Sequence, residues 1–242
     1  MIAGMTLSSQ PSPTVPIGTA GVFVVIPAFN EGAAIAEVLA QLKPFTAHLI
    51  VVDDGSTDST FETARRHGAH ALRHAINRGQ GAALQTGIAF ALRCGAEIIV
   101  TFDADGQHQV SDLADLIAPI QAGRCEIVLG SRFLSDQTQM PRRRRLLLRL
   151  ATWFTRVVSR MPVTDAHNGL RAFSRRAAER IDIHLDRMAH ASELIDQVRA
   201  SGLPWCEVPV SVRYTAYSLA KGQSSRGALK ILAHYLLGKV MP

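Results

Sequence analysis

Two aspartates two positions apart, Asp103 and Asp105, are the residues of this sequence best suited to holding a metal ion. They follow the apolar run 97–102 in the segment DADGQH, which places them in a tight turn after a predicted strand. Carboxylates with this spacing can converge on one hard cation, and Gln107 can add a neutral oxygen. Magnesium bound in this way takes its other ligands from water and substrate phosphates, so the pattern indicates a metal–diphosphate site. The alternative is a plain acidic turn.

Acidic residues also follow two earlier apolar runs. One run ends in PAFNE, with Pro27 and Glu31, and the other ends in DDGSTD, with Asp53 and Asp54. Adjacent carboxylates at the end of a buried strand are costly unless something uses them. Asp54 could therefore accept hydrogen bonds from a base or a ribose. The alternatives are a proline turn with an acidic helix start and an acidic turn that leads into a capped helix.

The elements that carry these turns alternate along the chain. Continuous apolar runs of strand length lie at 22–26, 48–52, 97–102 and 126–129, and a further strand is predicted over 206–213. Helical stretches are predicted at 31–42, 57–67, 81–93 and 111–121. Runs without polar alternation suit parallel strands covered on both faces, so the pattern predicts an α/β fold with a mostly parallel central sheet flanked by helices. Ligands bind outside the carboxyl ends of such strands, where the three acidic segments lie.

Composition bounds the class of protein. The chain has 242 residues, of which 47% are hydrophobic and 19% charged, as expected for one globular domain. The net charge of +6 favours phosphates, nucleic acid or an anionic membrane as partners. The three cysteines (Cys94, Cys125 and Cys206) are far apart in sequence and show neither CxxC nor zinc spacing. We therefore expect no disulfide scaffold and a reducing cytosol.

A basic segment near 143–161 is predicted to form an amphipathic helix. With about 3.6 residues per turn, one stripe holds Arg145, Arg149, Arg156 and Arg160, and leucines, valines, Phe154 and Met161 fall opposite. Such a helix suits a membrane interface; the alternative is a helix packed on the sheet with its charges in solvent. A weaker helix is predicted near 226–240, to dock on the membrane, on a partner or on the fold itself. We expect residues 1–20 to be a flexible leader and no segment to span a membrane.

Seven motifs together resemble the family 2 glycosyltransferases. They are IPAFNE at 26–31, VVDDGSTD at 51–58, NRGQGAALQTG at 77–87, DADGQH at 103–108, GSRF at 130–133, DAHNGLRAF at 165–173 and EVPVSVRY at 207–214. The branch that acts on dolichyl and polyprenyl phosphates is the most similar. The resemblance implies a Rossmann-like nucleotide-diphospho-sugar transferase fold (glycosyltransferase A) as a single domain over 21–242.

The resemblance also implies roles for individual residues. The nucleotide-sugar would be bound by Pro27, Phe29, Glu31, Val52, Asp54, Asp103, Ala104, Asp105, Arg132, Arg213 and Lys221. The metal, Mg²⁺ or Mn²⁺, would be held by Asp103, Asp105 and Gln107. Catalysis would rest on Asp105, Arg132 and Arg213. The candidates for the acceptor are Arg142, Arg143, Asp165, Asn168 and Glu193; for Asp165 and Asn168, a turn held by Asx hydrogen bonds stays an equal alternative.

These features predict an inverting transfer of a hexose from a GDP- or UDP-sugar to a polyprenyl or dolichyl phosphate. A phosphate monoester is already largely a dianion at neutral pH, so it needs clamping by arginine rather than a general base. We expect the enzyme at the cytoplasmic membrane face, alone or with a membrane partner subunit, in polysaccharide or glycoconjugate biosynthesis. The alternatives are transfer to a soluble or growing glycan, with Glu193 or Asp165 as base, and a non-catalytic nucleotide-sugar-binding subunit. The small aromatic fraction, 6%, argues against nucleic acid.

Overall fold

A computed structural model describes residues 19–135, 142–185 and 190–213, with the side chains of residues 142–144 left out. The predicted leader, except for its last two residues, lies outside the described residues, as do Lys221 and the predicted helix near 226–240.

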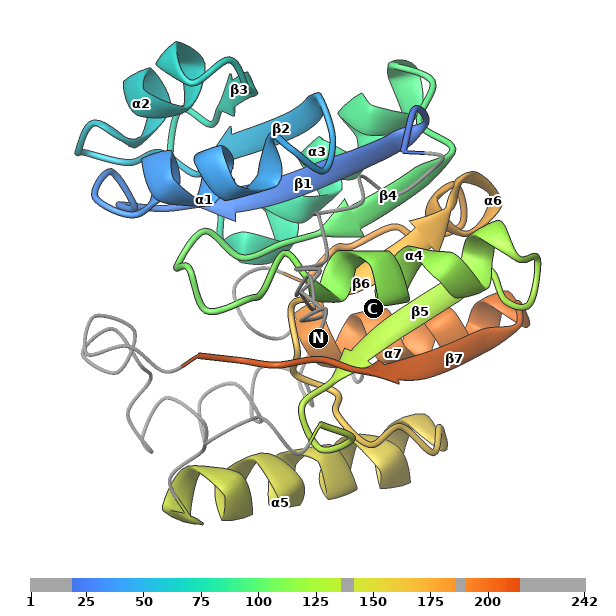
Figure 1. Ribbon diagram of the computed structural model, residues 1–242. Helices are drawn as coiled ribbons and strands as arrows, with labels where there is room; N and C mark the ends of the chain where they lie inside the picture. Colours follow the sequence, from blue (N-terminus) through green and yellow to red (C-terminus); the bar gives the residue numbers. More distant parts are fainter. Residues whose placement is uncertain (1–18, 136–141, 186–189, 214–242) are drawn as a thin grey trace, which may run out of the picture.

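A single seven-stranded sheet forms the centre of the molecule (Figure 1). Its strands are β1 (Val22–Ala28), β2 (His48–Asp53), β3 (His70–Arg73), β4 (Ile98–Thr101), β5 (Ile127–Ser131), β6 (Arg171–Ser174) and β7 (Trp205–Pro209). They are ordered β3-β2-β1-β4-β6-β5-β7, and only β6 runs antiparallel to its neighbours. The predicted α/β fold with a mostly parallel sheet is confirmed.

Helices cover both faces of this sheet. They are α1 (Ile35–Leu42), α2 (Thr60–Arg66), α3 (Gln80–Arg93), α4 (Asp112–Gln121), α5 (Arg142–Ser159), α6 (Arg175–Ala178) and α7 (His190–Ser201). On β1, Val24 packs with α1 and α4 in one core, and Val25 packs with α3 and α7 in the other. Both faces of β1 are therefore buried, which explains its unbroken apolar sequence.

The order of the strands creates a switch point at β1. The chain steps from β1 outward to β2 on one side and later to β4 on the other. In open sheets of this kind, the crevice outside the carboxyl ends at such a point is where ligands bind. The segments after β1, β2 and β4 are the three acidic segments of the sequence.

Two strands were not predicted, and one differs from its expected range. β3 and β6 have only four residues each, and both contain an arginine, so neither shows the apolar run that marks a central strand. The strand expected over 206–213 ends at Pro209, after which only Val212 forms a bridge, to His108. Proline has no N–H to donate to a ladder, and the shorter strand leaves residues 210–213 beside the acidic turn.

The basic helix α5 lies at one end of the molecule, apart from the sheet (Figure 1). It packs against α7, where Thr155 Oγ1 lies 3.4 Å from Ser192 Oγ. Its inward face holds the buried hydroxyl side chains of Thr152, Thr155 and Ser159. The helix ends at Ser159, so Met161, which we placed on its apolar face, lies beyond it and belongs to the core under the sheet.

Candidate functional site

The carboxylate that follows β2 organises the loop before α3. Asp54 is almost fully buried and accepts hydrogen bonds from the backbone N–H groups of Arg78 (2.9 Å) and Gly79 (2.6 Å). The Nδ1 atom of His74 lies 2.8 Å from the same carboxylate. Gly79 has φ of 96°, a conformation that glycine adopts without strain. Both oxygens of Asp54 thus hold protein groups, and its role toward a base or a ribose stays a prediction.

The loop held by Asp54 reaches the acidic turn after β4. Gln80 Nε2 donates to Asp103 Oδ1 at 2.9 Å, and His108 Nε2 lies 2.9 Å from Asp103 Oδ2. Gly169 packs against the same carboxylate so closely that a Cβ there would lie 2.3 Å from Asp103 Oδ2. The predicted turns after β2 and β4 are therefore joined by hydrogen bonds into one site.

Asp105, the second carboxylate of the turn, has a raised pKa. It accepts hydrogen bonds from the backbone N–H (3.0 Å) and the side-chain amide (2.7 Å) of Gln107. Burial, and then the neighbouring charge of Asp103, raise the pKa of Asp105 to about 6. Burial by itself would also raise the pKa of Asp103. The hydrogen bond and charge of His108 outweigh this effect, so the pKa of Asp103 is lowered.

This donor set fits a divalent cation. Two hard carboxylates lie close enough to repel each other, and a cation between them would remove that repulsion. Within the described ranges, no group of three or more His, Cys, Asp or Glu side chains could hold a metal. The protein would thus supply one or two carboxylates and the diphosphate the other ligands, which is how magnesium is usually held in nucleotide sites.

The predicted nucleotide contacts at the end of β1 and just after it are Pro27, Phe29 and Glu31. Pro27 pairs with Val52 in the β1–β2 register, so these two predicted nucleotide contacts are neighbours. Phe29 is exposed, whereas Glu31 is buried and near enough for its charge to raise the pKa of Asp105. Ala104 is buried within the turn itself.

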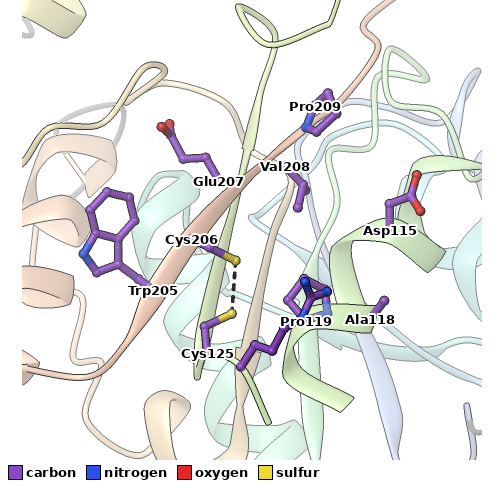
Figure 2. A pocket seen from close by; sticks show the side chains of 10 residues that line it. Asp115, Ala118, Pro119, Cys125, Trp205, Cys206, Glu207, Val208 and Pro209 are labelled. Atoms are coloured by element: carbon purple, nitrogen blue, oxygen red, sulfur yellow. Dashed lines mark hydrogen bonds between the residues drawn. The ribbon is translucent and has the colours of Figure 1, made fainter. Parts of the chain in front are cut away.

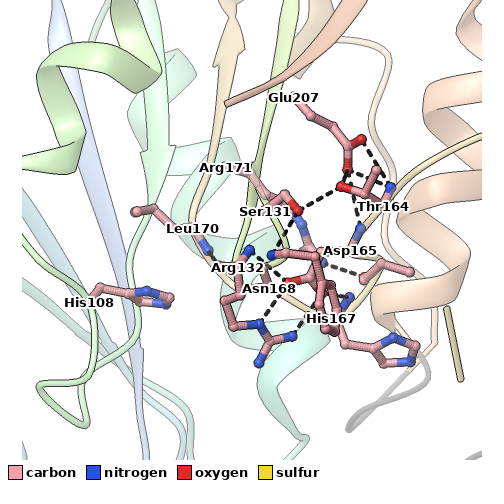
Figure 3. A network of polar contacts seen from close by, with 12 residues as sticks. His108, Ser131, Arg132, Thr164, Asp165, His167, Asn168, Leu170, Arg171 and Glu207 are labelled. Carbon is pink, nitrogen blue, oxygen red and sulfur yellow. Dashed lines mark hydrogen bonds and ion pairs between the residues drawn. The ribbon is translucent and has the colours of Figure 1, made fainter. Parts of the chain in front are cut away.

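Arg132 forms a buried ion pair on the other side of the site (Figure 3). Its Nε and Nη2 atoms donate to the two carboxylate oxygens of Asp165 at 2.6 and 2.8 Å, and its backbone N–H donates at 3.1 Å. The charge and hydrogen bonds of Arg132 outweigh the effect of burial and lower the pKa of Asp165. Here the guanidinium predicted to contact phosphates is paired with a carboxylate predicted to face the acceptor.

Glu207 of β7 supports this pair, and sequence reasoning missed it. Its carboxylate accepts hydrogen bonds from the backbone N–H groups of Thr164 (2.8 Å) and Asp165 (3.2 Å) and from Thr164 Oγ1 (3.0 Å) (Figure 3). Burial raises the pKa of Glu207. The only signal in the sequence was its position at the head of EVPVSVRY, because the contact joins residues more than 40 positions apart.

Arg171 of β6 is a second residue that the sequence analysis did not select. It is buried, it donates from Nη2 to the backbone carbonyl of Ala166 at 3.2 Å, and burial lowers its pKa to about 10. The charges of Asp103 and Asp165 oppose that effect. Arg171 therefore balances the two carboxylates from between the acidic turn and the Asp165 loop.

The remaining acceptor candidates have mixed positions. Asn168 Oδ1 accepts from the Leu170 N–H at 2.8 Å, an Asx turn, while its Nδ2 is buried without a hydrogen-bond partner among the described residues. Glu193 accepts from the backbone N–H groups of His184 (2.9 Å) and Leu185 (2.8 Å). Arg142 is the first residue of α5, and its side chain and that of Arg143 are not described.

Arg213 lies next to the turn at Asp103–Asp105. Its backbone N–H donates to the carbonyl of Gln107 at 2.9 Å, and its side chain is exposed. The short segment after β7 thus brings Arg213 to the edge of the acidic turn, and its role near the phosphates stays a prediction.

Residues 23–182 match the family described as Glycosyl transferase family 2. The chain belongs to glycosyl transferase family 2. As a family 2 enzyme it is 33% identical, over 91% of its length and 98% of the relative, to a UDP-N-acetylglucosamine–dolichyl-phosphate N-acetylglucosaminyltransferase of Methanococcus voltae. It is 29% identical, over 88% of its length and 85% of the relative, to a polyprenol monophosphomannose synthase of Mycolicibacterium smegmatis.

The fold of this family 2 enzyme has solved counterparts. A glucosyl-3-phosphoglycerate synthase of Mycobacterium tuberculosis, in complex with Mn²⁺, UDP and glucosyl-3-phosphoglycerate, superimposes with a TM-score of 0.69 at 22% identity. The match covers 92% of this chain and 81% of the synthase. The predicted glycosyltransferase A fold and the resemblance to the polyprenyl-phosphate branch are thereby confirmed. In the described part of the family 2 chain, each helix is too short or too polar to cross a membrane.

Proposed function

We propose that this family 2 enzyme is a metal-dependent, inverting glycosyltransferase that moves a hexose from a GDP- or UDP-sugar to a polyprenyl phosphate at the cytoplasmic face of a membrane. The joined turns after β2 and β4 support the donor side of the proposal. Asp103 and Asp105 would hold Mg²⁺ or Mn²⁺, and the bound ion would neutralise the departing diphosphate. Arg213, whose backbone N–H bonds to Gln107 in the same turn, would add a positive charge there.

The state of the two candidate bases is the observation that carries the choice of acceptor. Attack by a sugar hydroxyl needs a general base, and Asp165 and Glu193 are the carboxylates that the sequence offers. Asp165 is paired with Arg132 and its pKa is lowered, so it is a poor proton acceptor. Glu193 is bound by two backbone N–H groups. An acceptor that needs no base, such as a phosphate dianion, fits this arrangement.

The reaction on such an acceptor is a single displacement. An oxygen of the acceptor phosphate attacks the anomeric carbon while the bond from that carbon to the diphosphate breaks. The nucleoside diphosphate leaves with the electron pair, and the configuration inverts. The chain's task is to hold the two phosphate-bearing substrates in line, which is the kind of work that arginine and backbone donors do well.

The outward face of α5 supports a membrane-bound acceptor. Its large apolar side chains are exposed, with Trp153 at 64%, Leu146 at 61% and Val157 at 57%, and its small hydroxyl residues are the ones that are buried. A helix packed only for stability shows the reverse order. Exposed arginines flank the apolar strip; among them, Arg149 lies over the ring of Phe133, next to Arg132. An apolar strip bordered by arginine and tryptophan suits an anionic lipid interface.

Product analysis tests this proposal. The purified protein is incubated with Mn²⁺, vesicles containing a polyprenyl phosphate, and each of a panel of GDP- and UDP-sugars, and lipid-linked products are identified by mass spectrometry. We expect one sugar to be transferred by the wild type and none by Asp105→Asn. Transfer only to phosphoglycerate or to a soluble glycan would refute the lipid acceptor. Tight nucleotide binding without any product would instead favour a non-catalytic subunit.

A further inference from the structure

Two of the three cysteines, distant in sequence, meet away from the proposed catalytic site. Cys125 Sγ, just before β5, lies 3.1 Å from Cys206 Sγ on β7 (Figure 2). A disulfide has an S–S distance of about 2.05 Å, so the sulfurs need to approach by about 1 Å. The two residues are already held close because β5 and β7 are paired in parallel next to them, with Val128 opposite Cys206. The third cysteine, Cys94, is exposed and is not part of this pair.

The thiol pair borders a solvent-accessible cavity. Cys125 and Cys206 line a cavity of about 540 Å³ together with Pro119, Arg124 and Trp205 (Figure 2). This volume is ample for a small oxidant. Cys125 is buried, whereas Cys206 is partly exposed. A small molecule in this cavity therefore reaches the sulfur of Cys206 more readily than that of Cys125.

The two thiols are suited to different roles. Burial, and then the hydrogen bond with Cys206, raise the pKa of Cys125 to about 12. The thiolate is the attacking form of cysteine, so Cys125 is a poor first nucleophile at neutral pH. Its position, 3.1 Å from the sulfur of Cys206, instead suits it to attack second, once oxidation has made the Cys206 sulfur electrophilic.

From the contact, the cavity and the unequal burial, we infer that Cys125 and Cys206 form a two-thiol modification site that a hydroperoxide converts into a disulfide. The Cys206 thiol loses its proton, and the thiolate attacks a peroxide oxygen and breaks the O–O bond. With hydrogen peroxide this leaves a sulfenic acid and a hydroxide, which takes up the proton that the thiol lost and becomes water. The sulfur of Cys125 then attacks the sulfur of Cys206, the S–O bond breaks, and the hydroxyl leaves as a second water with the thiol proton. Two thiols and one hydrogen peroxide thus give one disulfide and two waters.

The disulfide would crosslink the edge strand β7 to the chain just before β5. Among the described strands, β7 pairs with β5 alone, and the new bond would close a loop between residues 81 positions apart. A crosslink over so long a loop raises thermal stability, by about 5 °C or more for a domain of this size. This inference does not depend on the proposed function, because neither cysteine belongs to the donor or acceptor site.

Oxidation of matched cysteine variants tests the site. Wild type, Cys94→Ser, Cys125→Ser and Cys206→Ser are treated with one equivalent of hydrogen peroxide, and free thiols are counted after denaturation. After oxidation, wild type should retain one free thiol and Cys94→Ser none. Both proteins should yield a disulfide-linked peptide that joins Cys125 to Cys206. Their thermal midpoint of unfolding should rise on oxidation and fall again on reduction. Neither of the other two variants should form an internal disulfide.

A trivalent arsenical provides a readout that needs no oxidation. Phenylarsine oxide links two neighbouring thiols with loss of one water, so Cys94→Ser should bind one equivalent and lose both thiols. The inference is wrong if peroxide leaves all three wild-type thiols free, if the disulfide involves Cys94, or if Cys206 is oxidised without pairing. The test on Cys94→Ser stands even if Cys125→Ser fails to fold, because it uses the intact pair.

Discussion

Replacing Asp165 by asparagine tests whether the Arg132–Asp165 pair holds the site together. The Asp165 side chain is fully buried and that of Arg132 is 8% exposed, and three hydrogen bonds join the two residues. Removing one partner of a buried pair leaves an uncompensated charge and costs about 3–5 kcal/mol. Asparagine keeps the shape and one acceptor oxygen, so we expect a loss near the lower value, about 3 kcal/mol.

The assay is urea unfolding at pH 7, followed by tryptophan fluorescence, for Asp165→Asn, Arg132→Met and the double variant. If the two side chains act on each other, the double variant should be more stable than the sum of the single losses predicts, by about 2 kcal/mol. The pKa of Asp165 is lowered by folding, so its contribution is present above its ordinary value of 3.8 and is lost as the pH falls through the folded value. A loss under about 1 kcal/mol with additive single effects would refute the pairing.

Three further predictions concern the acidic turn and α5. Gly169→Ala places a Cβ against Asp103 and should weaken Mn²⁺-dependent nucleotide binding by about tenfold or more; unchanged affinity in calorimetry would contradict the packing. The pKa of Asp105 is raised to about 6, so its carboxylate is ionised above that pH. The affinity for nucleotide in the presence of Mn²⁺ should fall by up to about tenfold per pH unit below it; an affinity that does not change between pH 7 and 5 would show that this carboxylate does not take part in binding. The double variant Trp153→Ala with Leu150→Ala should sediment with anionic vesicles about tenfold less, or less still, without a change in nucleotide binding in solution. Sedimentation equal to that of wild type would show that α5 does not bind the membrane.

The sequence was sufficient to predict the apolar strands β1, β2, β4 and β5 and the acidic segments after three of them, because these features are local. The runs before Asp54 and Asp103 are apolar throughout, and a parallel sheet brings their carboxyl ends to one edge. The family motifs then predicted the fold without knowledge of any contact. Arg213 was selected from the last motif; its backbone N–H bonds to Gln107 in the turn at Asp103–Asp105, and its role stays a prediction.

What the sequence could not predict depends on tertiary pairing. β6 lies antiparallel between β4 and β5, and its four residues carry no apolar run. The partners Arg132–Asp165 and Glu207–Thr164 come from different loops and strands, so their spacing in sequence carries no signal. The cysteines show the same limit: their separation in sequence gave no sign of a pair, whereas the pairing of β5 and β7 brings two of them together.

The claim that the turn at Asp103–Asp105 binds a diphosphate through a divalent cation has one direct test. UDP and GDP are titrated calorimetrically into wild type and Asp105→Asn, each with Mn²⁺ and with the ion chelated. We predict that Mn²⁺ strengthens binding of one nucleotide to wild type by about tenfold or more and has no effect on Asp105→Asn. The same Mn²⁺ dependence in both proteins would contradict the account.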